Sequence, residues 1–274
     1  MKGPAIEHME GLDAALRKAA KKGNAKAIRE LMAQGAGVAG PDENGMTSLM
    51  LAASSKKARC VKLLLPVVNL GAKKSAGAAL SICAQLGWAE GVRLLLDAIE
   101  GAAGGNPSTV RSFAKRGGGI GRTTLILAAG SACAECVELL LPLFEADAVD
   151  SDGKTALMVA AEAQKGAPAG CVAKLAAASN VLKRDWRGRN ALHHAARCGL
   201  PEAVEILAPL IDPRLRDKEC ENALDATRAR LDDDGERIRE TLRRAIAERE
   251  RGEIEAAAKE AGPPAGVALR ARSL

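Results

Sequence analysis

The stretch Thr47-Ser48-Leu49-Met50-Leu51-Ala52-Ala53 decides the fold. Thr47 can cap a helix, because its hydroxyl accepts a hydrogen bond from a backbone N–H of the first turn. Leu49, Ala52 and Ala53 are spaced i, i+3 and i+4, so they lie on one side of a helix. The two alanines let a neighbouring helix approach closely. The stretch therefore predicts a short helix that packs tightly against other helices.

A second helix is predicted shortly after the first. Its sequence is Cys60-Val61-Lys62-Leu63-Leu64-Leu65, and Pro66 ends it because proline has no backbone N–H to donate. The leucine of the first helix is thus followed, twelve residues later, by Val or Ile in the second, with a longer spacing in the fifth and seventh units. The unit recurs roughly every 33 residues, which indicates a repeat architecture. The starting leucines are Leu16, Leu49, Leu80, Leu125, Leu157, Leu192 and Leu224.

A turn that begins with Asp and ends with Gly precedes several first helices. Examples are Asp42-Glu43-Asn44-Gly45, Asp150-Ser151-Asp152-Gly153 and Asp185-Trp186-Arg187-Gly188. Glycine suits the last position because it accepts a positive φ. With this turn the unit resembles the ankyrin repeat, Asp-x-x-Gly-x-Thr-Pro-Leu-His-x-Ala-Ala followed by Val-x-x-Leu-Leu. The match is close at 45–53, 153–161 and 188–196, although the family's proline is absent from every unit. The resemblance implies an all-α ankyrin-repeat solenoid of about seven helix-turn-helix units with short hairpin loops.

The expected organisation follows the units. Glycines crowd residues 100–118, which predicts an insertion. In the last unit Cys220 replaces the turn glycine and Arg228 replaces a small residue, so this unit is degenerate. We expect an N-terminal capping repeat (1–41), repeats two and three (42–99), a Gly-rich insertion (100–118), repeats four to six (119–216), a degenerate C-terminal repeat (217–245), and a charged helix with a disordered tail (246–274).

The composition indicates how the interior is built and where in the cell the protein is expected. Aromatic residues make up 1% of the chain, so Ala, Leu and Val must build the interior, which suits thin layers of helices. No apolar run reaches the about 18 residues of a membrane span, and residues 1–10 lack a signal-peptide core. Seven cysteines without a secretory signal indicate reduced thiols. We therefore expect a cytoplasmic protein, with the nucleus as the alternative location, and no membrane association.

The residues that usually carry chemistry are scarce or explained by the repeat. The pair Cys133 and Cys136 has no second pair to complete a zinc site. Cys136 shares its register with Cys60 and Cys171, each just before the second-helix valine, which indicates a small buried residue. His193 falls on the histidine of the ankyrin motif, and the resemblance implies a structural hydrogen bond there. We expect no catalytic residue, no bound metal, no cofactor and no enzymatic activity.

The resemblance implies that a protein partner docks on the concave surface of hairpin tips and first helices. Trp186 stands out because Trp and Arg dominate binding hot spots and arginines flank it; the alternative is that Trp186 folds back onto the adjacent hairpin. The chain is expected to be a monomeric scaffold or adaptor. A basic surface that binds nucleic acid or another acidic partner is the alternative, because the net charge is +6. The candidate contact residues are Asn44, Met46, Arg122, Asp150, Lys154, Trp186, Arg187, Arg189, His194 and Arg197.

Overall fold

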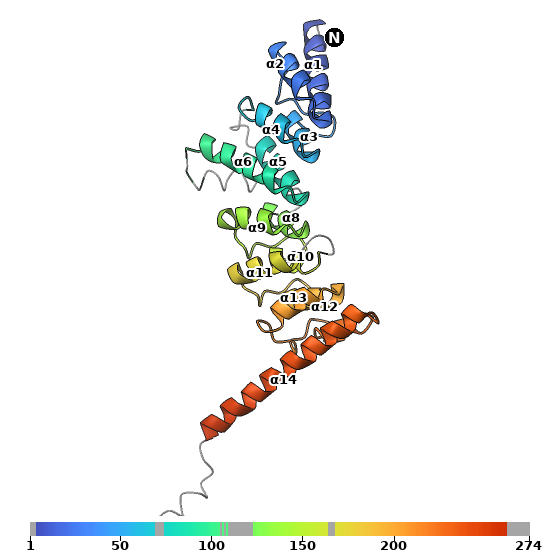
Figure 1. Cartoon of the computed structure of the whole chain (residues 1–274), viewed down its shortest axis with the longest axis vertical. Helices are drawn as coiled ribbons and strands as arrows, with labels where there is room; N and C mark the ends of the chain where they lie inside the picture. The colour runs from blue at the N-terminus through green and yellow to red at the C-terminus, as the bar shows by residue number, and fades with distance from the viewer. Residues whose placement is uncertain are drawn as a thin grey trace, which may run out of the picture.

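The protein is a stack of helix pairs in a computed structural model that describes residues 4–68, 74–104, 106, 108, 123–163 and 168–261. The helices form two rows that run the length of the stack (Figure 1). Successive first helices contact one another, and so do successive second helices. Over the described residues the only β-type pairing is an isolated bridge between Val149 and Thr155. The predicted all-α solenoid is confirmed.

The rows alternate along the chain. The first row contains α1 (Pro4–Lys22), α3 (Ser48–Ser54), α5 (Lys74–Gln85), α8 (Thr124–Gly130), α10 (Ala156–Ala160) and α12 (Ala191–Cys198). The second row contains α2 (Ala25–Ala33), α4 (Ala58–Leu64), α6 (Ala89–Ala102), α9 (Ala134–Leu140), α11 (Pro168–Ala178) and α13 (Pro201–Leu207). Two 3-10 turns, η1 (Leu141–Leu143) and η2 (Asp225–Thr227), and a long helix α14 (Asp233–Ala261) complete the described chain. We call the surface of hairpin turns and first-row helices the first-helix face.

Threonine or asparagine caps four of the first-row helices, α3, α8, α10 and α12. The hydroxyl of Thr47 accepts the backbone N–H of Met50 at 3.4 Å, as the sequence predicts. Thr123 and Thr155 cap α8 and α10 in the same way. Each cap satisfies a backbone donor that the first turn of a helix leaves without a partner.

One hairpin turn recurs at four places, and its aspartate organises it. In each case Oδ1 accepts the backbone N–H groups two and four residues later; for Asp150 the distances are 3.0 and 2.9 Å. The fourth residue of the turn has a positive φ, for example +76° at Gly153. Cys220 takes the same conformation with φ +64°. A positive φ raises the conformational energy of a residue that carries a side chain. The turns begin at Asp42, Asp150, Asp185 and Asp217.

The interior consists of small and aliphatic side chains between neighbouring pairs. Leu49, Ala52 and Ala53 are all fully buried, as their spacing predicts. Cys60, Cys136 and Cys171 are buried too, which confirms the prediction from their shared register. Each buried leucine contributes about 2 kcal/mol through removal of its surface from water.

The C-terminal helix α14 begins on the stack and then projects away from it (Figure 1). Ile238 and Leu242 are buried where α14 packs against α13, so this part replaces the second helix of the last unit. Farther along, Glu253 pairs with Arg214, and Arg249 donates to the carbonyl oxygen of Pro209 at 2.8 Å. None of the helices in the described part of the chain is long and apolar enough to span a bilayer.

Candidate functional site

Five of the predicted contact residues meet in one surface hollow. The hollow has a volume of about 330 Å³ and spans the tips of two adjacent hairpins and the end of α12. We call it the tryptophan hollow. It is lined by Asp152, Lys154, Asp185, Trp186, Arg187, Arg189 and Arg197.

Trp186 is both exposed to solvent and packed against the adjacent hairpin, the two arrangements that the sequence leaves open. Its indole lies against Gly153 of the preceding hairpin: a Cβ on that glycine would stand 2.7 Å from the indole Nε1. Its backbone N–H also donates to the carbonyl oxygen of Asp152 at 3.3 Å. Nevertheless the residue is 66% exposed. The ring is therefore supported from one side and open to solvent on the other.

Arg187 is the basic residue of the hollow that forms no ion pair within the described part of the chain. Its backbone N–H donates to Asp185 Oδ1 at 2.9 Å, which fixes the main chain below it. The side chain is exposed, and it forms no ion pair with any residue that the structure describes. An arginine side chain carries five N–H donors. Arg187 can therefore meet an incoming acceptor without breaking an existing contact.

Asp185 is the buried anchor of this hairpin. Its Oδ2 accepts from Arg189 Nη2 at 3.2 Å and lies 3.1 Å from His194 Nε2. Burial acts to raise the pKa of Asp185, but the Arg189 backbone N–H and the charges of His194 and Arg189 outweigh it and lower the pKa. The carboxylate therefore stays ionised and holds the turn and α12 together.

Glu162, in the turn after α10, is a second anchor below the hollow. Lys154 Nζ lies 2.7 Å from its Oε2, Arg197 Nη2 lies 3.0 Å from its Oε1, and His194 Nδ1 lies 2.7 Å from its Oε1. Burial acts to raise the pKa of Glu162, but the hydrogen bonds from His194 and Lys154 outweigh it and lower the pKa to about 2. Glu162 and Asp185 thus hold the imidazole between the turn after α10 and the next hairpin. The sequence does not single out Glu162 as an anchor, because its partners lie on other elements.

Two predicted contact residues are buried, and the prediction that they touch a partner is wrong. His194 is 0% exposed because Asp185 and Glu162 enclose its ring. Asp150 is 4% exposed because its carboxylate accepts backbone N–H groups of its own turn. Both residues support the first-helix face from below.

Asn44 and Met46 lie elsewhere on the stack. Asn44 lines a separate hollow of about 390 Å³ near the N-terminal end of the stack, beside Arg17, Lys18 and Lys21 of α1. Met46 is half-buried and packs against the hydrophobic core. Arg122 lies outside the described residues. Asn44 and Met46 therefore do not join the tryptophan hollow.

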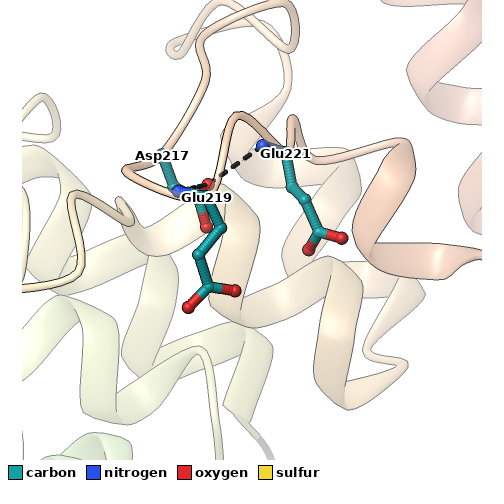
Figure 2. A group of neighbouring side chains, drawn as sticks. All are labelled: Asp217, Glu219 and Glu221. Carbon is teal, nitrogen blue, oxygen red and sulfur yellow. Dashed lines mark hydrogen bonds between the residues drawn. The ribbon is translucent and has the colours of Figure 1, made fainter.

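Three carboxylates gather at the tip of the last hairpin, as Figure 2 shows. Oxygen atoms of Asp217, Glu219 and Glu221 lie within 4.8 Å of one another. The Asp217 carboxylate already accepts the backbone N–H groups of Glu219 and Glu221, at 2.9 and 3.0 Å (Figure 2). Asp217 therefore serves the turn, as the equivalent aspartates do. These three residues line a further hollow that also contains Arg187, so the acidic tip borders the tryptophan hollow.

The thiols and His193 have structural environments. Burial raises the pKa of Cys83 to about 12 and that of Cys171 to about 11, so neither thiol is activated as a nucleophile. His193 forms a capping box with Asn190, and its Nε2 lies 3.2 Å from the carbonyl oxygen of Glu221 in the next hairpin. The structural role that the resemblance implies for His193 is confirmed.

Comparison with known proteins supports the repeat architecture. Residues 16–103 and 98–181 match the family described as ankyrin repeats (3 copies), which together is more than half of the chain. The ankyrin repeat domain of human ASB11 superposes with a TM-score of 0.64 at 23% identity, over 82% of this chain and 96% of that one. The ankyrin repeat domain of Bcl-3, a member of the IkappaB protein family, gives 0.59 at 25% identity, over 84% and 97%.

A curated relative shares part of the sequence. The E3 ubiquitin-protein ligase KEG of Arabidopsis thaliana is 35% identical over 140 residues. These residues make up 49% of this chain and 8% of that protein. The similarity is thus confined to a small part of the ligase.

Proposed function

The chain belongs to the ankyrin repeat family, and from this premise we propose that it is a protein-interaction scaffold that binds its partner at the tryptophan hollow. Ankyrin repeats are generally protein–protein interaction modules and are typically non-catalytic. A stack of repeats offers an extended surface to which several units contribute. The proposed surface is the part of the first-helix face formed by the hairpins that begin at Asp150 and Asp185.

The exposed indole of Trp186 beside the unpaired Arg187 carries this proposal. Trp and Arg are the residue types that most often contribute large binding energies. Gly153 supports the ring from below, and Asp185 holds the backbone of Arg187. A contact group on a rigid support loses less conformational entropy on binding. The hollow therefore has both the residue types and the rigidity of a binding hot spot.

Nucleic acid is the alternative partner, and the charge distribution disfavours it. Asp152 lines the hollow together with the basic residues, and the acidic tip at 217–221 borders it. A polyanion that tracks along the face would meet these carboxylates. A salt titration with random oligonucleotides tests this alternative, because phosphate contacts make binding strongly salt-dependent. Absence of binding at low salt eliminates it.

Affinity capture tests the proposed function. Full-length wild type, the double variant Trp186→Ala/Arg187→Ala and the control Arg59→Ala are immobilised and exposed to lysate of the cells that express the protein. Arg59 is an exposed arginine on α4, outside the hollow. Arg189 is left unchanged because it pairs with Asp185. We expect a protein that wild type and the control retain and the double variant loses. Identical capture by all three chains, or capture of nothing, contradicts the proposal.

A further inference from the structure

We propose that the tryptophan hollow receives a Glu or Asp side chain of an extended partner segment, and that Arg187 binds its carboxylate. The inference rests on the proposed function and adds the chemistry of the partner.

Basic side chains already pair with the two carboxylates below the hollow, Asp185 and Glu162. Asp185 accepts from Arg189 and faces His194, and Glu162 faces Lys154, Arg197 and His194. Both carboxylates are therefore already engaged by basic side chains of the protein. Asp185 and Glu162 thus position the basic side chains of the hollow. The N–H groups that these side chains do not use remain for a ligand.

Spare N–H donors remain on the basic side chains of the hollow. Arg187 uses none of its side-chain donors within the described chain, and Arg197 uses Nη2. Lys154 directs its ammonium at both oxygens of Glu162, and Arg189 uses Nε and Nη2 on Asp185. Asp152 is the one lining carboxylate that no described side chain pairs. Donors therefore exceed acceptors, and an incoming carboxylate meets complementary charge.

Trp186 adds an apolar platform next to these donors. A Glu or Asp side chain has an aliphatic stem and a charged end, so the stem can lie on the indole while the carboxylate reaches Arg187. Arginine binds a carboxylate through two parallel hydrogen bonds, which fixes its position as well as its charge. The pair of residues therefore selects for an acidic side chain over a neutral one.

The acidic tip of the last hairpin limits the direction of binding. Arg187, Arg189 and Arg197 line both the tryptophan hollow and the neighbouring hollow that contains Asp217, Glu219 and Glu221. Four carboxylates and four arginines line that hollow, so it offers an incoming acidic residue no net positive charge. The occupant is thus a short acidic segment on the Trp186 side, and a continuous polyanion fits poorly.

Indole NMR signals of the full-length chain provide the test. The chain has two tryptophans, and Trp88 at the start of α6 is an internal reference outside the hollow. The probes are an eight-residue Gly/Ser peptide with two adjacent glutamates, the same peptide with glutamines, the same peptide with lysines, and a twelve-nucleotide oligo-dT. Each is titrated into wild type, Arg187→Ala, Arg59→Ala and Asp152→Asn.

We expect the glutamate peptide to shift the Trp186 signal and not that of Trp88. Its affinity should fall about tenfold in Arg187→Ala and with the glutamine peptide, because a charge-assisted pair is lost. Arg59→Ala should bind as wild type does, and Asp152→Asn should bind more tightly because a repulsive carboxylate is removed.

Three results overturn the inference: equal affinity for the glutamate and glutamine peptides, no response to the glutamate peptide, or tighter binding of oligo-dT with the same dependence on Arg187. These outcomes are distinct from failure of the proposed function. If capture from lysate still depends on Trp186 and Arg187, the scaffold role stands and the acidic partner is wrong.

Discussion

Replacement of Glu162 by glutamine tests whether the buried ionic network supports the hairpins. The substitution keeps the size of the side chain and removes the charge that faces Lys154, Arg197 and His194. A pKa lowered from 4.5 to about 2 corresponds to about 3 kcal/mol of stability at neutral pH, at about 1.4 kcal/mol per pH unit. The side chain is 21% exposed, and solvent screens part of this. We therefore expect Glu162→Gln to lose about 2 to 3 kcal/mol.

The effect has a defined pH dependence. A carboxyl group whose pKa is lower in the folded state stabilises the fold above its unfolded pKa, near 4.5, and this contribution disappears as the pH falls toward 2. The stability difference between wild type and Glu162→Gln should therefore be largest at pH 7 and should shrink between pH 4.5 and 3. Glu162→Gln itself should depend less on pH in this range.

Urea unfolding followed by Trp186 fluorescence in a Trp88→Phe background measures this difference in the C-terminal repeats. Glu138→Gln is the matched control, because Glu138 also pairs with a lysine, Lys174, but on the exposed second-row side. Exposed ion pairs contribute little, so this control should unfold close to wild type. Equal midpoints for Glu162→Gln and wild type at pH 7, or the same difference at pH 7 and pH 3, would refute the reasoning.

Three further outcomes are expected. Cys220→Gly should raise the free energy of unfolding by about 1 kcal/mol in urea titrations, because it relieves a positive φ of +64° at a side-chain-bearing residue; an unchanged midpoint counts against this. Gly153→Ala should lower the stability by about 1 to 2 kcal/mol and shift the Trp186 indole signal, since its φ is +76° and its Cβ would meet the indole; an unmoved signal shows that the ring does not rest there. In the native chain a thiol-specific reagent should modify the exposed Cys220 first and the buried Cys83 only after unfolding; early modification of Cys83 contradicts the buried register.

Local sequence predicts most of the fold, because each unit repeats the same physical signals. Thr47 and its counterparts cap helices, and the leucine and alanine positions are buried in every clear unit. The turn aspartate with its following glycine is equally local, since the two backbone N–H groups that its Oδ1 accepts lie two and four residues later. Even the irregular position Cys220 is visible in the sequence, because it stands in the register of the turn glycine.

The site was harder to predict, because exposure of polar residues depends on neighbouring units. His194 has the position of an exposed first-helix residue, but Glu162 of the preceding unit encloses it from one side and Asp185 from the other. Asp150 looks like a tip residue, but the turn needs its carboxylate. Trp186 is exposed and also packed against Gly153, so neither sequence alternative describes it fully.

Site-specific photo-crosslinking tests most directly the central claim that a protein partner occupies the tryptophan hollow. A benzoylphenylalanine is introduced in place of Asp152, which lines the hollow, and in a control chain in place of Asp97, an exposed residue on α6 in the second row. Irradiation in cells that express the protein should give a defined protein adduct from position 152 and none from position 97. Adducts of the same protein from both positions, or from position 97 alone, would contradict the claim.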